Sequence, residues 1–279
     1  MKNLPSLFSV STAHLLRRKL VLSAFVVSAG FLALYWLLCS QMSKHGGAGM
    51  QTSDMALGAL FMTLPAAATL SSAFAFILGS SVLPDEIQSG RAAYWAALPV
   101  SRMEIFTGFG LSSLAACLSV SLFLFGGIVG ITHACLPYVE TSIPAAIGAF
   151  LLWHAVLWSS ITLLSLLVHR MVAIIICFSA WGISTFLGGL AQVARAAPGE
   201  SVARAIVTAG GVSAVVYPAD QAFRTMVYGL LPSGAALDDM MAFAGAITGA
   251  PALQLGWAAL AAILFTILAA RRFAKSDLG

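Results

Sequence analysis

The stretch that decides the fold runs from residue 141 to residue 194 and reads TSIPAAIGAFLLWHAVLWSSITLLSLLVHRMVAIIICFSAWGISTFLGGLAQVA. It is largely apolar, and His154, His169 and Arg170 are its only basic residues; it has no acidic ones. As a single helix it would measure about 80 Å, whereas the hydrocarbon core of a bilayer is about 30 Å thick. The stretch must therefore fold back on itself, and the polar pair His169–Arg170 is the place to turn. We predict two membrane-spanning helices joined by a very short cytoplasmic link.

The rest of the chain has the same character, because 60% of its 279 residues are hydrophobic and only 9% are charged. That is too little charge to cover a soluble domain of this size. A charged side chain at the centre of a spanning helix costs roughly 2.5–3.5 kcal/mol, so long uncharged runs mark the spans. Six such runs are at least 20 residues long, as a span requires, and nothing alternates as in a membrane barrel. We predict an all-α integral membrane protein, one transmembrane domain over residues 1–279, with spans at about 20–40, 55–83, 105–133, 143–168, 171–191 and 250–270.

The distribution of Lys and Arg predicts the orientation of these spans. Ten of the 14 Lys and Arg residues fall in the two termini, in the loop at residues 85–104 and at the 169–170 turn. The opposite loops carry the other four, together with six acidic residues that include Asp220. By the positive-inside rule, both termini are cytoplasmic. We expect a multi-pass protein of a bacterial cytoplasmic (inner) membrane, in contact with lipid, and no nucleic-acid partner.

Two further segments have a pattern of their own. The segment before Arg17 spaces Leu4, Leu7, Phe8 and Leu15 at helical intervals, which is typical of an interfacial helix on the cytoplasmic leaflet; a disordered polar tail is the alternative. The external segment 192–249 contains an apolar stretch, residues 205–219, that is too short to span. We expect a re-entrant or surface element there, before the sixth span.

The cytoplasmic loop at residues 84–104 has the pattern of a short amphipathic helix. Pro84 precedes two acidic residues, as in the first turn of a helix, Pro99 ends the segment, and Ser101 can cap the next span. Tyr94, Trp95 and Leu98 fall on one side of it. That aromatic ridge can contact a partner protein, or it can anchor the loop among lipid headgroups.

Several kinds of catalytic motif are absent from the sequence. It contains no phosphate-binding Gly-x-x-x-x-Gly-Lys-Ser/Thr loop, no His-Glu-x-x-His, no Gly-x-Ser-x-Gly and no Cys-x-x-Cys. The four cysteines are scattered in or beside the spans, and we expect no metal site and no cofactor bound by this chain. His154 lies at membrane depth, where it either faces a translocation pathway or is a neutral histidine bonded to a neighbouring helix.

The cytoplasmic loop carries a resemblance to a known family. Glu86-x-x-Ser-Gly90, then Leu98-Pro-Val-Ser-Arg102 followed by Glu104-Ile105 and Gly108, resembles the loop between the second and third spans of ABC transporter permeases of the type-2 exporter class. The tail Arg271-Arg272-Phe273-Ala-Lys275 is similar to the end of many such permeases, although Phe109 stands where the family has Lys. The resemblance implies a second permease copy or close relative, and two separate ATPase subunits that bind ATP-Mg. It also implies that this loop couples ATPase movement to the spans, through Asp85, Glu86, Gly90, Arg91, Tyr94, Trp95, Leu98, Arg102 and Glu104.

Other classes of membrane protein fit the composition as well. A six-span secondary carrier, or a membrane assembly factor, would act without an ATPase. Carriers usually show internal repeats and ionisable groups near the midplane, and the sequence shows neither a clear repeat nor an acidic residue inside a predicted span. An integral membrane enzyme has the least support, because no catalytic constellation is visible.

Overall fold

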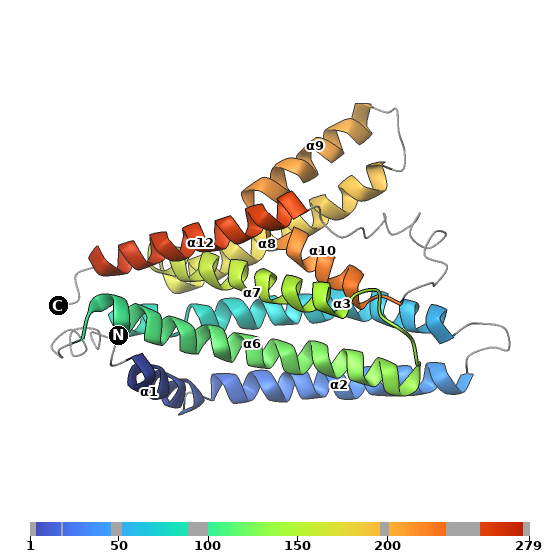
Figure 1. The fold of residues 1–279 in the computed structure, drawn as a ribbon, viewed down its shortest axis with the longest axis horizontal. Helices are drawn as coiled ribbons and strands as arrows, with labels where there is room; N and C mark the ends of the chain where they lie inside the picture. The colour runs from blue at the N-terminus through green and yellow to red at the C-terminus, as the bar shows by residue number, and fades with distance from the viewer. Residues whose placement is uncertain are drawn as a thin grey trace.

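A computed structural model describes residues 4–17, 19–45, 52–88, 100–195, 201–232 and 252–275 of the chain. These residues form helices, and their only β-type pairing is one isolated bridge between Glu140 and Pro232 (Figure 1). The predicted all-helical class is confirmed for the described part of the chain. The helices are α1 (Leu4–Arg17), α2 (Leu20–His45), α3 (Thr52–Gly79), α4 (Leu83–Gln88), α6 (Arg102–Cys135), α7 (Ile143–Ser165), α8 (Arg170–Arg195), α9 (Ser201–Val216), α10 (Ala219–Leu230) and α12 (Ala252–Lys275).

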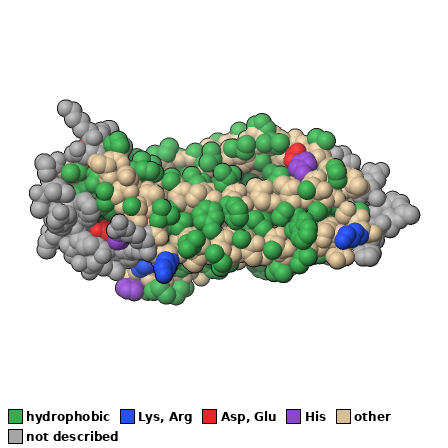
Figure 2. All heavy atoms as spheres, turned by 90° about the horizontal axis from the view of Figure 1, so that it is seen from below, with side chains coloured by type: hydrophobic (Ala, Val, Ile, Leu, Met, Phe, Trp, Pro, Cys, Tyr) green, Lys and Arg blue, Asp and Glu red, His purple; other side chains and the backbone are tan. Residues whose placement is uncertain are grey.

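Six of these helices are long and apolar enough to cross a membrane, namely α2, α3, α6, α7, α8 and α12. They coincide with the six uncharged runs of the sequence. On the face shown in Figure 2, hydrophobic side chains cover the middle of the molecule, and the charged side chains in view gather toward its two ends. The architecture is that of a multi-pass membrane protein.

The fold-back in the deciding stretch occurs where the sequence predicts it. Helix α7 ends at Ser165 and α8 begins at Arg170. Arg170 then ties this turn to the end of α3, because its guanidinium donates to the Ser80 hydroxyl (3.3 Å) and to the Ile77 carbonyl (3.4 Å). The α7–α8 turn and the last turn of α3 are therefore fixed to one another at this end of the bundle.

Helix α7 lies at the centre of the bundle and contacts α3, α6, α8, α10 and α12. Its Trp153 is fully buried, with its ring 5.8 Å from that of Phe125 and 5.2 Å from that of Phe223. One turn further on, Trp158 packs against Gly110 and Gly79, where a side chain would collide with neighbouring atoms, and donates to Ser113 (2.8 Å). Large rings on α7 thus fill the space that small residues on α3 and α6 leave, as in close-packed membrane helices.

Helix α1 packs against α6, at the same end of the bundle as the last turn of α12 (Figure 1). Leu7 and Leu15, which the sequence places on the apolar face of an interfacial helix, are buried in a cluster with residues of α6 and α12. Ser11 is also buried and shares a hydrogen bond of 2.5 Å with Ser112 of α6. The apolar face of α1 therefore meets protein, because Gly108 lets the two helices approach closely at Leu7.

The opposite end of the bundle is held by the α6–α7 loop. Its Thr141 and Ser142 backbone N–H groups donate to the Leu231 and Gly229 carbonyls at the end of α10 (2.9 and 3.0 Å). Glu140 pairs with His133, whose ring stacks on Tyr138 with 4.5 Å between centroids. Burial raises the pKa of Tyr138 above its ordinary value, so the ring stays a neutral phenol. The end of α10 is consequently fixed to this loop.

Helices α9 and α10 form a bent pair, with an angle of 101° between them. The pair turns at Tyr217 and Pro218, and the end of α10 returns to the end of the bundle where α8 finishes (Figure 1). The tip of the pair, at Tyr217, is held inside the bundle by two hydrogen bonds. The Tyr217 hydroxyl shares one with the Ser160 hydroxyl of α7 (3.0 Å), and the Tyr217 backbone carbonyl accepts one from the Ser184 hydroxyl of α8 (3.0 Å).

Candidate functional site

The end of the bundle at which α1 and the last turn of α12 pack on α6 contains the described part of the predicted coupling loop. Helix α4 follows α3 after a short turn and contacts α6 and α7. Its Glu86 is only 6% exposed, and a carboxylate oxygen lies 3.9 Å from Nε2 of His14 on α1. In this structure Glu86 therefore faces α1. Asp85 is part of the same helix.

The first turn of α6 is built by a capping box. Ser101 is the N-cap residue: its hydroxyl accepts from the Glu104 backbone N–H (3.2 Å), and the Glu104 carboxylate accepts from the Ser101 backbone N–H (3.1 Å). This reciprocal arrangement satisfies two backbone donors that a helix start otherwise leaves unpaired. The predicted cap at Ser101 is confirmed.

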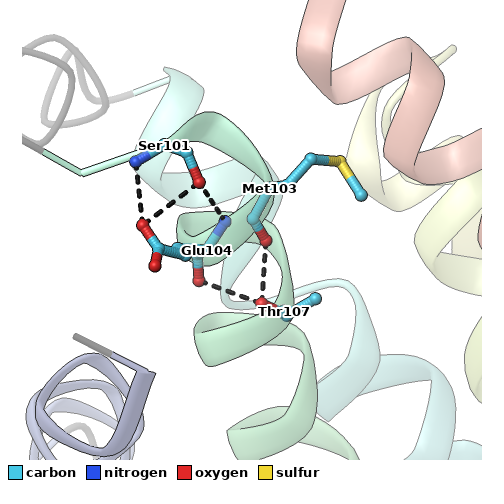
Figure 3. Close-up of a pocket in the computed structure, with 4 residues that line it drawn as sticks. All are labelled: Ser101, Met103, Glu104 and Thr107. Carbon is cyan, nitrogen blue, oxygen red and sulfur yellow. Dashed lines mark hydrogen bonds between the residues drawn. The ribbon is translucent and has the colours of Figure 1, made fainter. Parts of the chain in front are cut away.

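Two further features surround this first turn. The Arg102 guanidinium donates to the Ala274 carbonyl in the last turn of α12 (2.8 Å), where a cation is favoured by the helix dipole. Ser101, Met103, Glu104 and Thr107 line an open depression at the surface, and the Thr107 hydroxyl bonds back to the helix backbone (Figure 3). Arg102 and Glu104 thus stand in the capped first turn of α6, which one hydrogen bond joins to α12.

Of the nine predicted coupling residues, the structure brings four to this end of the bundle: Asp85 and Glu86 on α4, and Arg102 and Glu104 on α6. The other five, Gly90, Arg91, Tyr94, Trp95 and Leu98, lie outside the described residues. Arg102 bonds the start of α6 to α12, and Glu86 of α4 lies beside His14 of α1.

His154 of α7, the predicted pathway candidate, is fully buried between three helices. Its Nδ1 lies 2.9 Å from the Phe150 carbonyl, which can only accept, so Nδ1 carries the proton. Its Nε2 then accepts from the Ser71 hydroxyl of α3 (3.1 Å), and Ser71 in turn lies 2.7 Å from the Ser121 hydroxyl of α6. This is the arrangement of a neutral histidine that joins α3, α6 and α7.

A second buried polar cluster was missed by the sequence analysis. Asp220 and Arg224 of α10 form an ion pair of 2.7 Å, in which the side chains are 1% and 11% exposed. Arg224 also donates to the Thr185 carbonyl of α8 (3.1 Å). The sequence analysis counts both residues among the charges of the external loops, and the structure shows that they are enclosed between α10 and α8 instead of being exposed. The i, i+4 spacing of an acid and an arginine was the available signal.

The described part of the chain contains neither a cluster of metal-ligating side chains nor a disulfide. No group of three or more His, Cys, Asp or Glu side chains there could hold a metal ion, and the four cysteines are unpaired, with Cys39, Cys117 and Cys177 buried. A scan against protein-family models finds no match to this chain, and a search of curated proteins finds no significant match.

Proposed function

We propose that this chain is the membrane-spanning permease subunit of an ATP-driven transporter of the type-2 exporter class. In this proposal it has no catalytic site of its own, and two separate ATPase subunits bind and hydrolyse ATP-Mg. The observation that carries the proposal is the loop at residues 84–104, where the residues that resemble the family's motif stand between the second and third apolar helices.

The anchoring of that loop supports a coupling role. A push on a loop moves a membrane helix only if the loop is rigidly joined to it. The capping box at Ser101 fixes the start of α6, and Arg102 links the same point to α12. On the other side, α4 contacts α6 and α7 and meets α1 through Glu86. A force from a soluble partner would therefore reach several helices at once.

The remaining architecture is consistent with a half-transporter. We propose that α1 lies at the cytoplasmic face, that the bent pair α9–α10 is a re-entrant element entering from the outer face, and that both termini are cytoplasmic. The basic residues at the start of α8 and at the end of α12, among them Arg170, Arg271 and Lys275, favour that orientation in a bacterial inner membrane. A second copy of the chain, or a close relative, would complete the transporter.

The proposal is tested by replacing the aromatic residue that the sequence places at the centre of the partner contact. Truncating a Trp hot spot at an interface typically costs about 2 kcal/mol or more. We expect Trp95→Ala to release the ATPase from a complex extracted in mild detergent, while the permease remains inserted in the membrane. The matched control is Trp36→Ala, since Trp36 is 53% exposed on α2 and distant from the loop in sequence.

Two outcomes of this co-purification would contradict the proposed contact between Trp95 and the ATPase. If a P-loop ATPase co-purifies with both variants in the same amount, Trp95 does not hold the ATPase and its role is to anchor the loop among headgroups. If no P-loop ATPase co-purifies with the unmodified chain either, the transporter assignment itself fails.

One observation favours a second candidate, a six-span secondary carrier or membrane assembly factor that acts without an ATPase. Carriers use ionisable groups inside the bundle, and Asp220 is a buried carboxylate of that kind. Its direct pairing with Arg224 neutralises it, however, which leaves no net charge to couple to an ion. Transport by the purified chain in liposomes without nucleotide would select this second candidate.

A further inference from the structure

The helices of the outer half of the molecule divide into two groups. Helix α9 packs mainly against α8, whereas α10 packs mainly against α7 and the α6–α7 loop. Although α9 and α10 are consecutive, they touch little beyond their shared tip, because they diverge at 101°. In Figure 1, α9 and the second half of α8 stand away from the remaining helices. A seam therefore runs between an α8–α9 hairpin and the rest of the bundle.

The hairpin is fixed to the bundle at its inner end. Arg170, the first residue of α8, donates to Ser80 and to the Ile77 carbonyl at the end of α3. Thr185, where α8 meets Arg224, lies about 22 Å further along the helix at 1.5 Å per residue. Taken over its whole length, α8 contacts α9 more extensively than it contacts α3 or α7. The contacts of Arg170 and the contact at Thr185 therefore hold different parts of α8 against the bundle.

Polar contacts cross the seam near the tip of the bent pair. Arg224 of α10 donates to the Thr185 carbonyl, and Ser184 donates to the Tyr217 carbonyl. Gly188, one turn further along α8, faces the ion pair directly: a Cβ atom there would lie 2.8 Å from Nη2 of Arg224 and closer still to the Asp220 carboxylate. The next residue, Gly189, is different, since a Cβ atom there would meet only Nη2 of Arg224, at an ordinary 3.9 Å.

The ion pair is well suited to hold two groups together. Asp220 fixes the guanidinium through Nε and leaves Nη2 to reach the carbonyl of α8. Removing one partner from such a buried pair leaves an uncompensated charge, which is strongly unfavourable. Val202, Val212 and Val215 of α9 are exposed, and one further hydrogen bond joins α9 to the rest of the bundle, from the Trp257 indole N–H of α12 to the Val215 carbonyl (2.8 Å). A movement of α9 against the bundle would break this bond as well.

From these contacts we propose that α8 and α9 move as one unit against the rest of the bundle, and that the Asp220–Arg224 pair, bonded to Thr185 and accommodated by Gly188, is the clamp that holds this seam closed. The clamp uses only residues of this chain. The proposed clamp does not depend on the proposed ATPase partner.

The test measures distances between spin labels in the purified full chain in lipid nanodiscs, in a Cys135→Ser background. One label pair crosses the seam, at Val212 of α9 and Ile147 of α7, and a second pair stays within the unit, at Val212 and Ile183 of α8; all three positions are more than half exposed. The clamp is opened in two ways. Arg224→Gln removes the charge, and Gly188→Ala keeps both charges but fills the space that the pair occupies.

Gly189→Ala is the matched control, because it adds the same methyl group and the same helix propensity one residue away. In Arg224→Gln and Gly188→Ala, we expect the population at longer distances across the seam to rise about tenfold or more, while the distances within the unit stay unchanged. Gly189→Ala should keep the distribution of the unmodified chain. An unchanged seam distance in Gly188→Ala, or equal broadening of both label pairs, would overturn the proposal.

Discussion

Replacing Gly108 by Ala should detach α1 from α6. An added Cβ atom at this position would lie 2.8 Å from Cβ of Leu7 and 3.6 Å from two backbone atoms of α1. None of these atoms is the end of a flexible side chain, so no change of rotamer relieves the collision and α1 itself has to move. That movement also breaks the hydrogen bond between Ser11 and Ser112.

The magnitude follows from two opposing effects. Overpacking a buried contact typically costs about 1–3 kcal/mol, whereas exchanging Gly for Ala inside a helix gains up to about 1 kcal/mol. Because no rotamer change relieves this collision, the overpacking cost lies in the upper part of its range, about 2–3 kcal/mol, and the docking of α1 is weakened by a net of about 1–2 kcal/mol. At about 1.4 kcal/mol per factor of ten, the undocked population rises about 5- to 30-fold.

A cysteine at Ser11 reports this opening, because Ser11 is completely buried and a thiol there reacts with a water-soluble maleimide only when α1 undocks. We expect its labelling rate to rise by the same 5- to 30-fold in Gly108→Ala. Gly126→Ala, on the same helix with nothing within 4 Å of the added methyl group, should leave the rate unchanged. Equal rates in the two variants would refute the packing of α1 on α6.

Three further predictions concern topology, capping and the buried histidine. In sealed cells, a cysteine placed at Glu200 should react with an impermeant reagent added outside, whereas a cysteine placed at Ser276 should not. Labelling of Ser276 from outside would contradict the predicted orientation. Ser101→Ala should lower the free energy of unfolding by about 1 kcal/mol, measured by denaturation in detergent, through loss of the α6 cap; an unchanged value would show that the cap contributes nothing. His154→Ala should lower the free energy of unfolding by about 3 kcal/mol or more, because it opens a cavity and leaves buried serine hydroxyls unpaired. Ser119→Ala, at an exposed site, should lower it by almost nothing. Equal losses in the two variants would contradict the bridging role of His154.

The sequence was sufficient to predict those features that depend on local properties. A spanning helix needs only sufficient uncharged length, so all six spans were predictable. The turn at Arg170 was predictable because Arg170 is the only residue with a permanent charge in a long apolar stretch. The cap at Ser101 is also local, since its partner Glu104 is three residues away.

Features that depend on contacts between distant residues were not predictable in this way. His154 could be placed at membrane depth, but its partners Ser71 and Ser121 come from two other helices. Asp220 and Arg224 were assigned to an external loop, because a count of charges treats every charge as a sign of solvent. The structure buries them, since each neutralises the other and Gly188 of α8 leaves room for the pair.

The glycines show the same limit. Gly108 and Gly126 lie on one helix and look equivalent in the sequence, yet only Gly108 is in close contact with another helix. Which of two glycines lies at an interface is decided by the three-dimensional packing, which the spacing of residues along the chain does not specify.

Native mass spectrometry of the complex released from its own membrane in mild detergent shows whether this chain is one half of an ATP-driven transporter. We expect a particle with two copies of this 29.0 kDa chain, or one copy and a close relative, together with two P-loop ATPase subunits. A particle that contains this chain but no nucleotide-binding protein would contradict it.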